Sequence, residues 1–276
     1  MNVLVAVAAL ALATMVAAGL MLFARTRAPE GSRFSDGDRA SGVFGAVATG
    51  FSVLLGFLIF LGFSSYDASR QGAETEAVLV LQQAQTAQFM AQDVSSDLSG
   101  QLVCYARSVA TTEWDSLDDG RLGERVNPWG AELFLTMSDV TPGTATEQSA
   151  YDRWMDQTAA REEARLTRVH GMEGIVPLPL WVTLGVLSLV LLGFMLLFAD
   201  PAEGAGTQVA LIGSVTVVMG ALVLLLVFFD HPHGDGLGRL QPTAMERTLR
   251  LLDTEFTVAG VTVTPPCDGR GRALRG

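Results

Sequence analysis

The chain has 276 residues, 49% of them hydrophobic, with a net charge of −11 and a mean hydropathy of +0.36, a balance that excludes an ordinary soluble domain. All 18 basic residues are arginine, as is typical of GC-rich bacterial genomes, and they form no basic patch of the kind that binds nucleic acid. Two cysteines are too few for a disulfide-rich scaffold, and neither lies in a metal-binding spacing.

Four segments are free of ionisable side chains and long enough to cross a membrane as helices, which takes about 20 apolar residues. They cover 3–24, 42–63, 176–199 and 207–229. The sequence therefore predicts an all-α, four-span helical membrane protein, with transmembrane hairpins in 1–63 and 176–229. A cleaved signal peptide is the alternative for the first span. Such a peptide begins with basic residues, whereas here Arg25 and Arg27 follow the apolar run, so we expect a retained anchor.

The distribution of arginine predicts how the chain crosses the bacterial plasma membrane. The short connection 25–41 holds four arginines, and short cytoplasmic loops carry the excess of basic residues. This places the connection in the cytoplasm, and the N-terminus, the segment 64–175 and the tail 230–276 outside it. Arginines that oppose this orientation are spread over longer sequence: Arg161, Arg165 and Arg168 before the third span, and Arg239, Arg247 and Arg250 after the fourth.

The segment 64–175 is predicted to be an acidic, helical extramembrane module. It holds 8 Arg and 18 Asp or Glu, nearly the whole net charge. Apolar residues at three-and-four spacing predict one helix from Ala77 to Val109 and a second from Glu147 to His170, with Gly171 as its C-cap. Breakers such as Asn-Pro predict turns in 115–130 and 139–146.

The tail 230–276 is predicted to hold a short amphipathic helix. Pro242 opens it, and Met245, Leu249 and Leu252 form its apolar side. The last residues are rich in proline and glycine, and we expect them to be frayed.

The second span carries small residues in a stripe that lets two helix backbones approach closely, with bulky aromatic residues beside it. The residues are Gly42, Ala46, Gly50 and Gly56, and the aromatic ones are Phe57 and Phe60. One interpretation is helix packing within the chain. The other is packing around a symmetry axis, where the phenylalanines form a hydrophobic constriction. Because no span holds an ionisable residue, proton-coupled transport and voltage gating are disfavoured, which leaves a pore gated by dewetting.

Two further features admit alternatives. The Asp-His-Pro-His-Gly-Asp sequence at 230–235 could hold a divalent metal, or it could be a polar turn that ends the fourth span. Cys104 and Cys267 lie on the same side of the membrane in either orientation. They could form a disulfide if that side is outside the cytoplasm, or remain free thiols.

The sequence contains no catalytic motif, and we expect no enzyme and no cofactor. Glu74, Glu76 and Glu113 could act as acids or bases, but no nucleophile motif, phosphate-binding loop or metalloprotease motif accompanies them. Solvated helix surface is the role expected for these carboxylates.

In chain order, these features resemble the bacterial family of proteins with a bestrophin-like domain. The resemblance begins with the Gly-Phe-Ser-Val-Leu-Leu-Gly-Phe sequence at 50–57 and covers most of the chain between 42 and 252. It continues through Tyr66, Asp67, Glu74, Glu76, Tyr105, Glu113, Trp114, His231 and Pro232. The family's name implies similarity to pentameric anion channels whose second helix lines the pore. Those channels keep their termini and middle segment in the cytoplasm, the opposite of the orientation that arginine predicts here, and their calcium-binding acidic cluster has no residue-by-residue match.

Two functions are compatible with these features. The first is an oligomeric, bestrophin-like pore or transport-like protein, a homo-oligomer in the lipid bilayer that conducts an ion not identified by the sequence. The second is a membrane-anchored sensor or scaffold whose acidic helical module binds a partner protein or cations.

Overall fold

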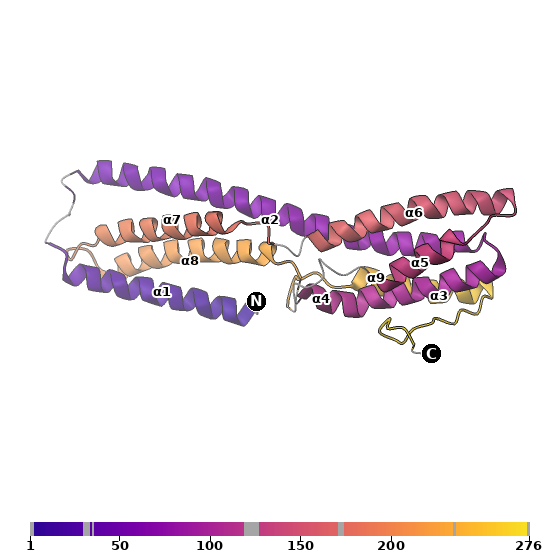
Figure 1. The fold of residues 1–276 in the computed structure, drawn as a ribbon. Helices are drawn as coiled ribbons and strands as arrows, with labels where there is room; N and C mark the ends of the chain where they lie inside the picture. The colour runs from indigo at the N-terminus through magenta and orange to yellow at the C-terminus, as the bar shows by residue number, and fades with distance from the viewer. Residues whose placement is uncertain are drawn as a thin grey trace. The chain divides into compact units, whose positions relative to one another are not determined.

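The computed structural model describes residues 3–29, 34, 36–118, 127–170, 174–233 and 236–274. Within these ranges the protein is built of helices, and the one β-bridge, between Cys267 and Ala273, is isolated. The helices shown in Figure 1 are α1 (Val3–Thr26), α2 (Gly37–Ala87), α3 (Gln92–Ser108), the π-helix η1 (Val109–Glu113), α4 (Trp114–Asp118), α5 (Pro128–Ser138), α6 (Ala145–His170), α7 (Leu178–Leu197), α8 (Ala205–Asp230) and α9 (Thr243–Ala259). The prediction of an all-α fold is confirmed.

The chain forms two compact units. The membrane unit comprises Met1–Ser65, Gly174–His231 and Asp235–Gly238, and the helical module comprises Tyr66–Glu173, Pro232–Gly234 and Arg239–Gly276. The four helices α1, α2, α7 and α8 are long and apolar enough to cross a membrane, which confirms the four predicted spans.

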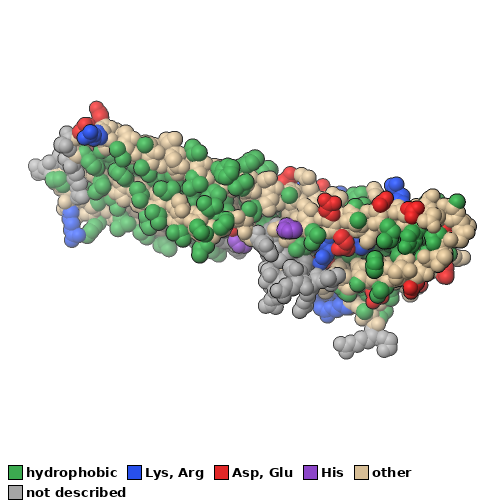
Figure 2. Space-filling model, turned by 45° about the horizontal axis from the view of Figure 1, so that its top comes forward, with side chains coloured by type: hydrophobic (Ala, Val, Ile, Leu, Met, Phe, Trp, Pro, Cys, Tyr) green, Lys and Arg blue, Asp and Glu red, His purple; other side chains and the backbone are tan. Residues whose placement is uncertain are grey.

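The interior of the membrane unit is made by one face of each helix. Phe51, Leu55 and Leu58 of α2 pack against α7 and α8, and a second cluster joins α1 to the facing ends of α7 and α8. Large apolar side chains cover much of the outside of this unit (Figure 2), as expected of a surface in contact with lipid acyl chains.

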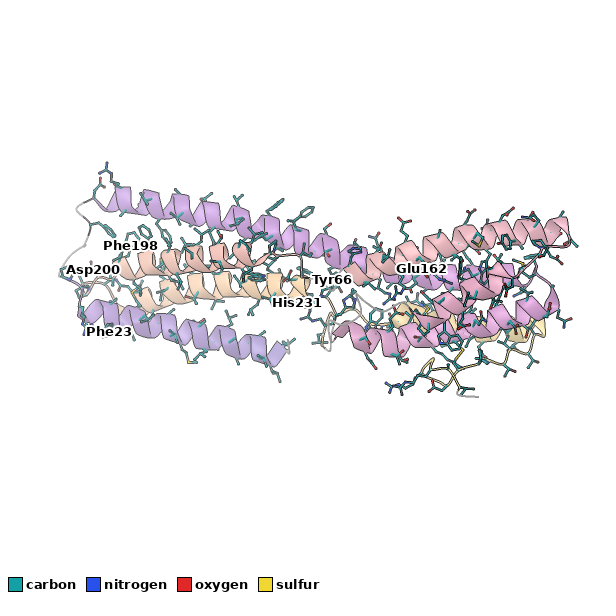
Figure 3. The ribbon with its side chains drawn as sticks, in the orientation of Figure 1. Phe23, Tyr66, Glu162, Phe198, Asp200 and His231 are labelled. Atoms are coloured by element: carbon teal, nitrogen blue, oxygen red, sulfur yellow. A yellow bond between two sulfur atoms is a disulfide. The ribbon has the colours of Figure 1, made fainter. Side chains whose placement is uncertain are left out.

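The connection after α1 and the turn between α7 and α8 lie at the same end of the membrane unit. Arg25 Nη1 donates to the carbonyl of Glu203 at 2.6 Å, and its Nη2 donates to that of Pro201 at 3.2 Å. In Figure 3, Phe23 and Asp200 are both seen at this end. The two connections therefore share one side of the membrane, as a four-span arrangement of either orientation requires.

The core of the helical module is formed by α3, α5, α6, α9 and the C-terminal part of α2. Its largest fully buried apolar and aromatic side chains are Trp154, Tyr105, Leu98, Leu102, Leu133 and Met137. Glycine permits the closest helix approach: a Cβ at Gly72 of α2 would lie 2.6 Å from the backbone nitrogen of Arg168 in α6. Without that glycine, α2 and α6 could not meet at this distance.

The predicted single helix from Ala77 to Val109 is wrong. The second span continues without a break to Ala87, because no proline or other breaker follows it. Backbone bonds of the i to i+3 type, from Gln88 to Gln85 and from Met90 to Ala87, end the helix, and α3 begins at Gln92. The chain reverses in this turn, so that the apolar stripes of α2 and α3 meet in the core.

Two other expectations differ from the structure. The Asn-Pro pair that predicted a turn begins α5 instead: the Asn127 side chain accepts a hydrogen bond from Trp129 N at 3.0 Å, and Pro128 occupies the first helical position. The tail is ordered rather than frayed through 274, with backbone bonds from Asp268 N to the Arg272 carbonyl and from Leu274 N to the Pro266 carbonyl. The tail helix is confirmed, whereas Gly171 lies outside the described residues.

Candidate functional site

One face of α2 in the membrane unit makes no contact with the rest of the described chain. An added Cβ at Gly42, Gly50 or Gly56 would meet no heavy atom within 4 Å. Phe57 and Phe60 are 58% and 64% exposed, and Ala46 is exposed as well. The predicted small-residue stripe therefore does not mediate packing within the subunit.

This face of α2 combines small residues, hydroxyl groups and phenylalanines, although exposed glycines also occur at Gly19 of α1 and Gly185 of α7. The large exposed side chains of α1, α7 and α8 are mainly aliphatic, for example Leu12, Val186 and Val218. On α2 the exposed residues include glycine, alanine and two hydroxyl side chains, and each hydroxyl donates to its own helix: Thr49 to the Gly45 carbonyl and Ser52 to the Ala48 carbonyl, both at 2.8 Å. The two hydroxyl groups on this face therefore have hydrogen-bond acceptors within α2 itself.

Two carboxylates of α2 lie on the surface of the helical module. Asp67 and Glu74 flank Arg70, whose Nε lies 3.8 Å from an oxygen of each. These pairs are exposed and contribute little to stability. Glu74 therefore has the solvated position expected from the sequence.

Glu76, by contrast, is completely buried and central to a network of charged groups. Its Oε1 accepts a hydrogen bond from the Tyr105 hydroxyl at 2.6 Å, and its Oε2 accepts one from Arg168 Nε at 2.6 Å. Burial, and next the charge of Glu76, raise the pKa of Tyr105 well above its ordinary value, so the phenol stays a donor. The expectation of a solvated surface role is wrong for Glu76.

Glu113, the last residue of the π-helix η1, also belongs to this network. Its Oε1 accepts hydrogen bonds from Arg165 Nε and Arg168 Nη2, both at 2.9 Å, and its Oε2 accepts one from Asn127 at 2.8 Å. Burial opposes its ionisation, but the two arginines and the amide hold the pKa of Glu113 below its ordinary value. Glu113 is also buried, so the solvated role is wrong here too. A π-turn often marks a functional position in a helix.

Trp114 follows directly and packs with Tyr66 and Leu240. The Arg168 guanidinium carbon lies 5.6 Å from the Trp114 ring centroid, and the His233 ring lies 5.5 Å from it. Burial, together with the positive charges of Arg168 and Arg239, lowers the pKa of His233 to about 4. His233 is therefore neutral at physiological pH.

The remaining predicted residues lie near the end of α8. Asp230 is buried, and its Oδ1 accepts a hydrogen bond from Val176 N at 3.0 Å, while exposed His231 lies 3.6 Å from its Oδ2. The Pro232 carbonyl accepts from Leu240 N. The described residues contain no cluster of three metal-ligating side chains, but Asp235 lies outside them, so the metal interpretation stays untested.

A disulfide joins Cys104 of α3 to Cys267 of the tail, with the Cα atoms 5.8 Å apart. Of the two states that the sequence left open, the structure has the bonded one. The bond fixes the tail across the helical module.

Comparison with known proteins assigns the fold to a family. A model of the bestrophin-like domain matches residues 8–245. The protein belongs to the bestrophin-like family. The resemblance found in the sequence is thereby confirmed.

Solved structures agree with this assignment. Two variants of a bacterial bestrophin homologue from Klebsiella pneumoniae superpose on this bestrophin-like chain with TM-scores of 0.68 and 0.67 at 12% and 13% identity, and both alignments cover 90% of this chain and 98% of the homologue. A crystal structure described as a membrane protein matches with a TM-score of 0.67 at 12% identity, over 90% of this chain and 98% of that one. At these identities the likeness shows a shared fold. No curated protein sequence matches the chain.

Sequence reasoning missed the basic half of the buried network in this bestrophin-like protein. Arg161, Arg165 and Arg168 were treated only as topology signals, although they lie at i, i+4 and i+7 on the face of α6 that also buries Trp154 and Gln157. Arg161 Nη1 donates to Gln83 Oε1 at 2.8 Å, and its guanidinium carbon lies 4.6 Å from the Tyr105 ring centroid. Arginine repeated on an otherwise buried helix face was the signal available.

Proposed function

We propose that this bestrophin-like protein is one subunit of an oligomeric membrane pore in which the exposed face of α2 packs about the central axis. The observation that carries this proposal is the open glycine stripe at Gly42, Gly50 and Gly56, which has no partner within the subunit. Backbones that approach through glycine gain close van der Waals contact, which drives helix association in lipid.

The phenylalanines on the same face supply a gate for such a pore. Phe57 and Phe60 are 58% and 64% exposed in the single subunit, whereas the Phe63 ring packs edge-on against Phe229 of α8. Around an axis Phe57 and Phe60 would form a narrow apolar ring, which closes a channel by excluding water rather than by a charged barrier. The similarity to bestrophin homologues supports a fold able to assemble in this way.

We further propose that the helical module and tail lie outside the cytoplasm. The arginine-rich connection 25–41 favours a cytoplasmic position for that end of the membrane unit. The disulfide between Cys104 and Cys267 independently favours an oxidising compartment for the module, because such bonds are rare in the cytosol. Both observations oppose the cytoplasmic module that the resemblance to anion channels implied.

Assembly and ion flux test the pore. We expect the purified protein to form a defined oligomer by light scattering and to release ions from liposomes. Gly50→Leu should reduce both, because the leucine occupies the proposed helix contact. The matched control is Gly185→Leu on α7, which is equally open in the subunit and should leave both unchanged. Phe60→Ala should increase flux by widening the apolar ring.

A monomer without flux would refute the pore and favour the anchored sensor or scaffold. Equal effects of the two leucine substitutions would also refute the assignment of α2 to the axis. For orientation, an impermeant thiol reagent applied to reduced, intact spheroplasts should label Cys104 or Cys267. Labelling that requires lysis of the spheroplasts would reverse the proposed orientation.

A further inference from the structure

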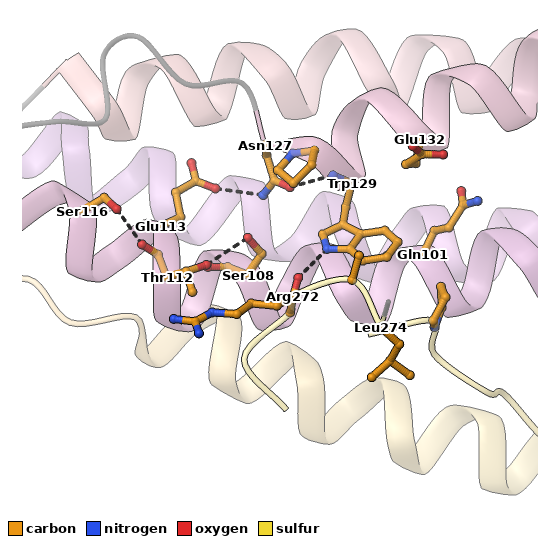
Figure 4. A pocket seen from close by; sticks show the side chains of 14 residues that line it. Gln101, Ser108, Thr112, Glu113, Ser116, Asn127, Trp129, Glu132, Arg272 and Leu274 are labelled. Atoms are coloured by element: carbon orange, nitrogen blue, oxygen red, sulfur yellow. Dashed lines mark hydrogen bonds between the residues drawn. The ribbon is translucent and has the colours of Figure 1, made fainter. Parts of the chain in front are cut away.

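The helical module contains a cavity of about 610 Å³ beside the π-helix. This volume is in the range of small-molecule sites, roughly 300–1,000 Å³. Its walls come from α3, η1, α4, α5 and the tail, as Figure 4 shows. No residue of the buried charge network other than Glu113 and Asn127 takes part.

The tail forms one wall, and a disulfide and two hydrogen bonds hold it there. The disulfide at Cys267 fixes its beginning. Trp129 Nε1 donates to the Gly271 carbonyl at 2.6 Å, and Arg107 Nη1 reaches the Asp268 carbonyl at 3.4 Å. Gly271 has a φ of +72°, and a Cβ there would lie 2.8 Å from the Cys104 carbonyl oxygen, so only glycine lets the tail lie this close. The position of this cavity wall is therefore fixed by covalent and hydrogen bonds within the fold.

Two exposed, charged side chains lie in its lining, Glu132 of α5 and Arg272 of the tail, and neither side chain forms a hydrogen bond or a close ion pair among the described residues. In Figure 4, Arg272 lies on the same side of Trp129 as Thr112 and Ser116, and Glu132 lies on the other side. Glu113, by contrast, is fully engaged by Arg165, Arg168 and Asn127. Glu132 can only accept hydrogen bonds and Arg272 can only donate them.

Hydroxyl groups line the stretch beside Arg272. Ser108 and Thr112 lie 3.3 Å apart through their hydroxyl oxygens, and Ser116 donates to the Thr112 carbonyl at 2.7 Å. Each hydroxyl oxygen keeps lone pairs that can accept a further bond. The Trp129 ring and Pro266 supply apolar surface next to these groups.

This lining selects a neutral ligand. The lining carries charges of both signs, so a lone anion beside Glu132 and a lone cation beside Arg272 would each meet a like charge. A compound with several hydroxyl groups can donate to Glu132, accept from Arg272 and do both with the serine and threonine hydroxyls. The apolar parts of the compound would lie against Pro266 and the small part of Trp129 that is exposed, as is usual for a mostly apolar pocket with a few directed polar groups.

We infer that this cavity is a binding site for a small neutral polyhydroxyl compound, of the size of a mono- or disaccharide. The inference is independent of the pore, since it depends only on groups within the helical module. Binding is expected to weaken about tenfold or more on removal of either Glu132 or Arg272, because each supplies a charge-assisted hydrogen bond.

Calorimetric titration of the full-length protein with maltose and with D-glucose tests this site. The protein must be held in lauryldimethylamine oxide or lipid nanodiscs, because maltoside and glucoside detergents carry the proposed ligand class. Saturable binding of at least one sugar, weakened in Glu132→Ala and Arg272→Ala, supports the site. The matched controls are the exposed residues Glu163 and Arg247, whose alanine variants should bind with unchanged affinity.

Three results would overturn the inference. The first is the absence of saturable binding of either sugar up to about 50 mM, which would detect a millimolar Kd. The second is sugar binding that the Glu132 and Arg272 variants leave as strong as in the wild type. The third is binding of acetate or choline, probes with one charge each, that is weakened by the same variants while neither sugar binds.

Discussion

The close approach of α2 and α6 gives a sharp prediction for Gly72→Ala. The added methyl group would lie 2.6 Å from Arg168 N, 2.8 Å from the Ala164 carbonyl oxygen and 3.1 Å from the Thr167 carbonyl carbon. All three are backbone atoms, so no side-chain rotation can relieve the contact. Ordinary van der Waals contact requires the helices to separate by about 0.8 Å.

That separation also stretches two short polar contacts near it. The Ser69 hydroxyl donates to the Arg168 carbonyl at 2.6 Å, and Arg168 Nε donates to Glu76 at 2.6 Å. Overpacking alone typically costs about 1–3 kcal/mol, and loosening a buried ion pair adds to it. We expect a loss of about 2–4 kcal/mol, or a Tm lower by roughly 5–15 °C.

Thermal unfolding of the detergent-solubilised protein, followed by intrinsic tryptophan fluorescence, measures this change. Gly130→Ala in α5 is the matched control, because its methyl group would lie 3.5 Å from Glu162 and 3.8 Å from Tyr105, at ordinary contact distance. Its Tm should stay the same or rise, since alanine favours a helix over glycine by about 1 kcal/mol. Equal Tm values for the two variants would refute the argument that backbone contact at Gly72 sets the spacing of α2 and α6.

Three further predictions follow from the helical module. Cys267→Ser, or a reductant, should destabilise the protein by up to about 5 kcal/mol, the chain-entropy value for a loop closed across 163 positions; a Tm unaffected by reductant would contradict this. The pKa of His233 is about 4 in the folded protein and 6.5 in the unfolded chain, so the unfolded chain takes up a proton first as the pH falls. The free energy of unfolding should therefore decrease by about 3 kcal/mol between pH 6.5 and pH 4. His233→Phe should flatten the plot of Tm against pH in that window, and an unchanged slope would count against the burial of a neutral imidazole. Tyr105→Phe should cost about 1–3 kcal/mol, because Glu76 Oε1 loses its shortest hydrogen bond; a variant as stable as the wild type would show that Arg168 alone satisfies Glu76.

The membrane spans could be predicted from the sequence because the physical rule is local. About 20 apolar residues without a charge suffice to identify a span, and the structure has a helix at each such run. The same locality explains why the length of α2 could not be predicted. Apolar periodicity shows which side of a helix is buried. It does not show whether a membrane span and the helix that follows it outside the membrane form one continuous helix. The chain reverses after Ala87 without a proline or a glycine, so no helix-breaking residue marks this turn in the sequence.

The candidate sites were harder to predict because their residues meet across long sequence separations. Glu76 and Arg168 are 92 positions apart, and a single sequence gives no measure of such pairing. The sequence predicts a solvated Glu76, yet this residue lies next to Ala77 on the buried face of α2. The cavity wall was missed because the proline and glycine content of the tail suggests flexibility, whereas the disulfide and the Trp129 bond hold it in place.

The bond between Cys104 and Cys267 closes a covalent ring that contains two complete membrane spans, α7 and α8. A protease that cuts the polypeptide once anywhere inside this ring leaves a single covalent molecule, and its fragments separate on a gel only after reduction. A cut outside the ring releases a fragment even without reduction. The segments outside it are the part that contains α1 and α2 and the final residues of the chain. A single cut inside the ring would therefore leave the two spans tethered to the rest of the protein.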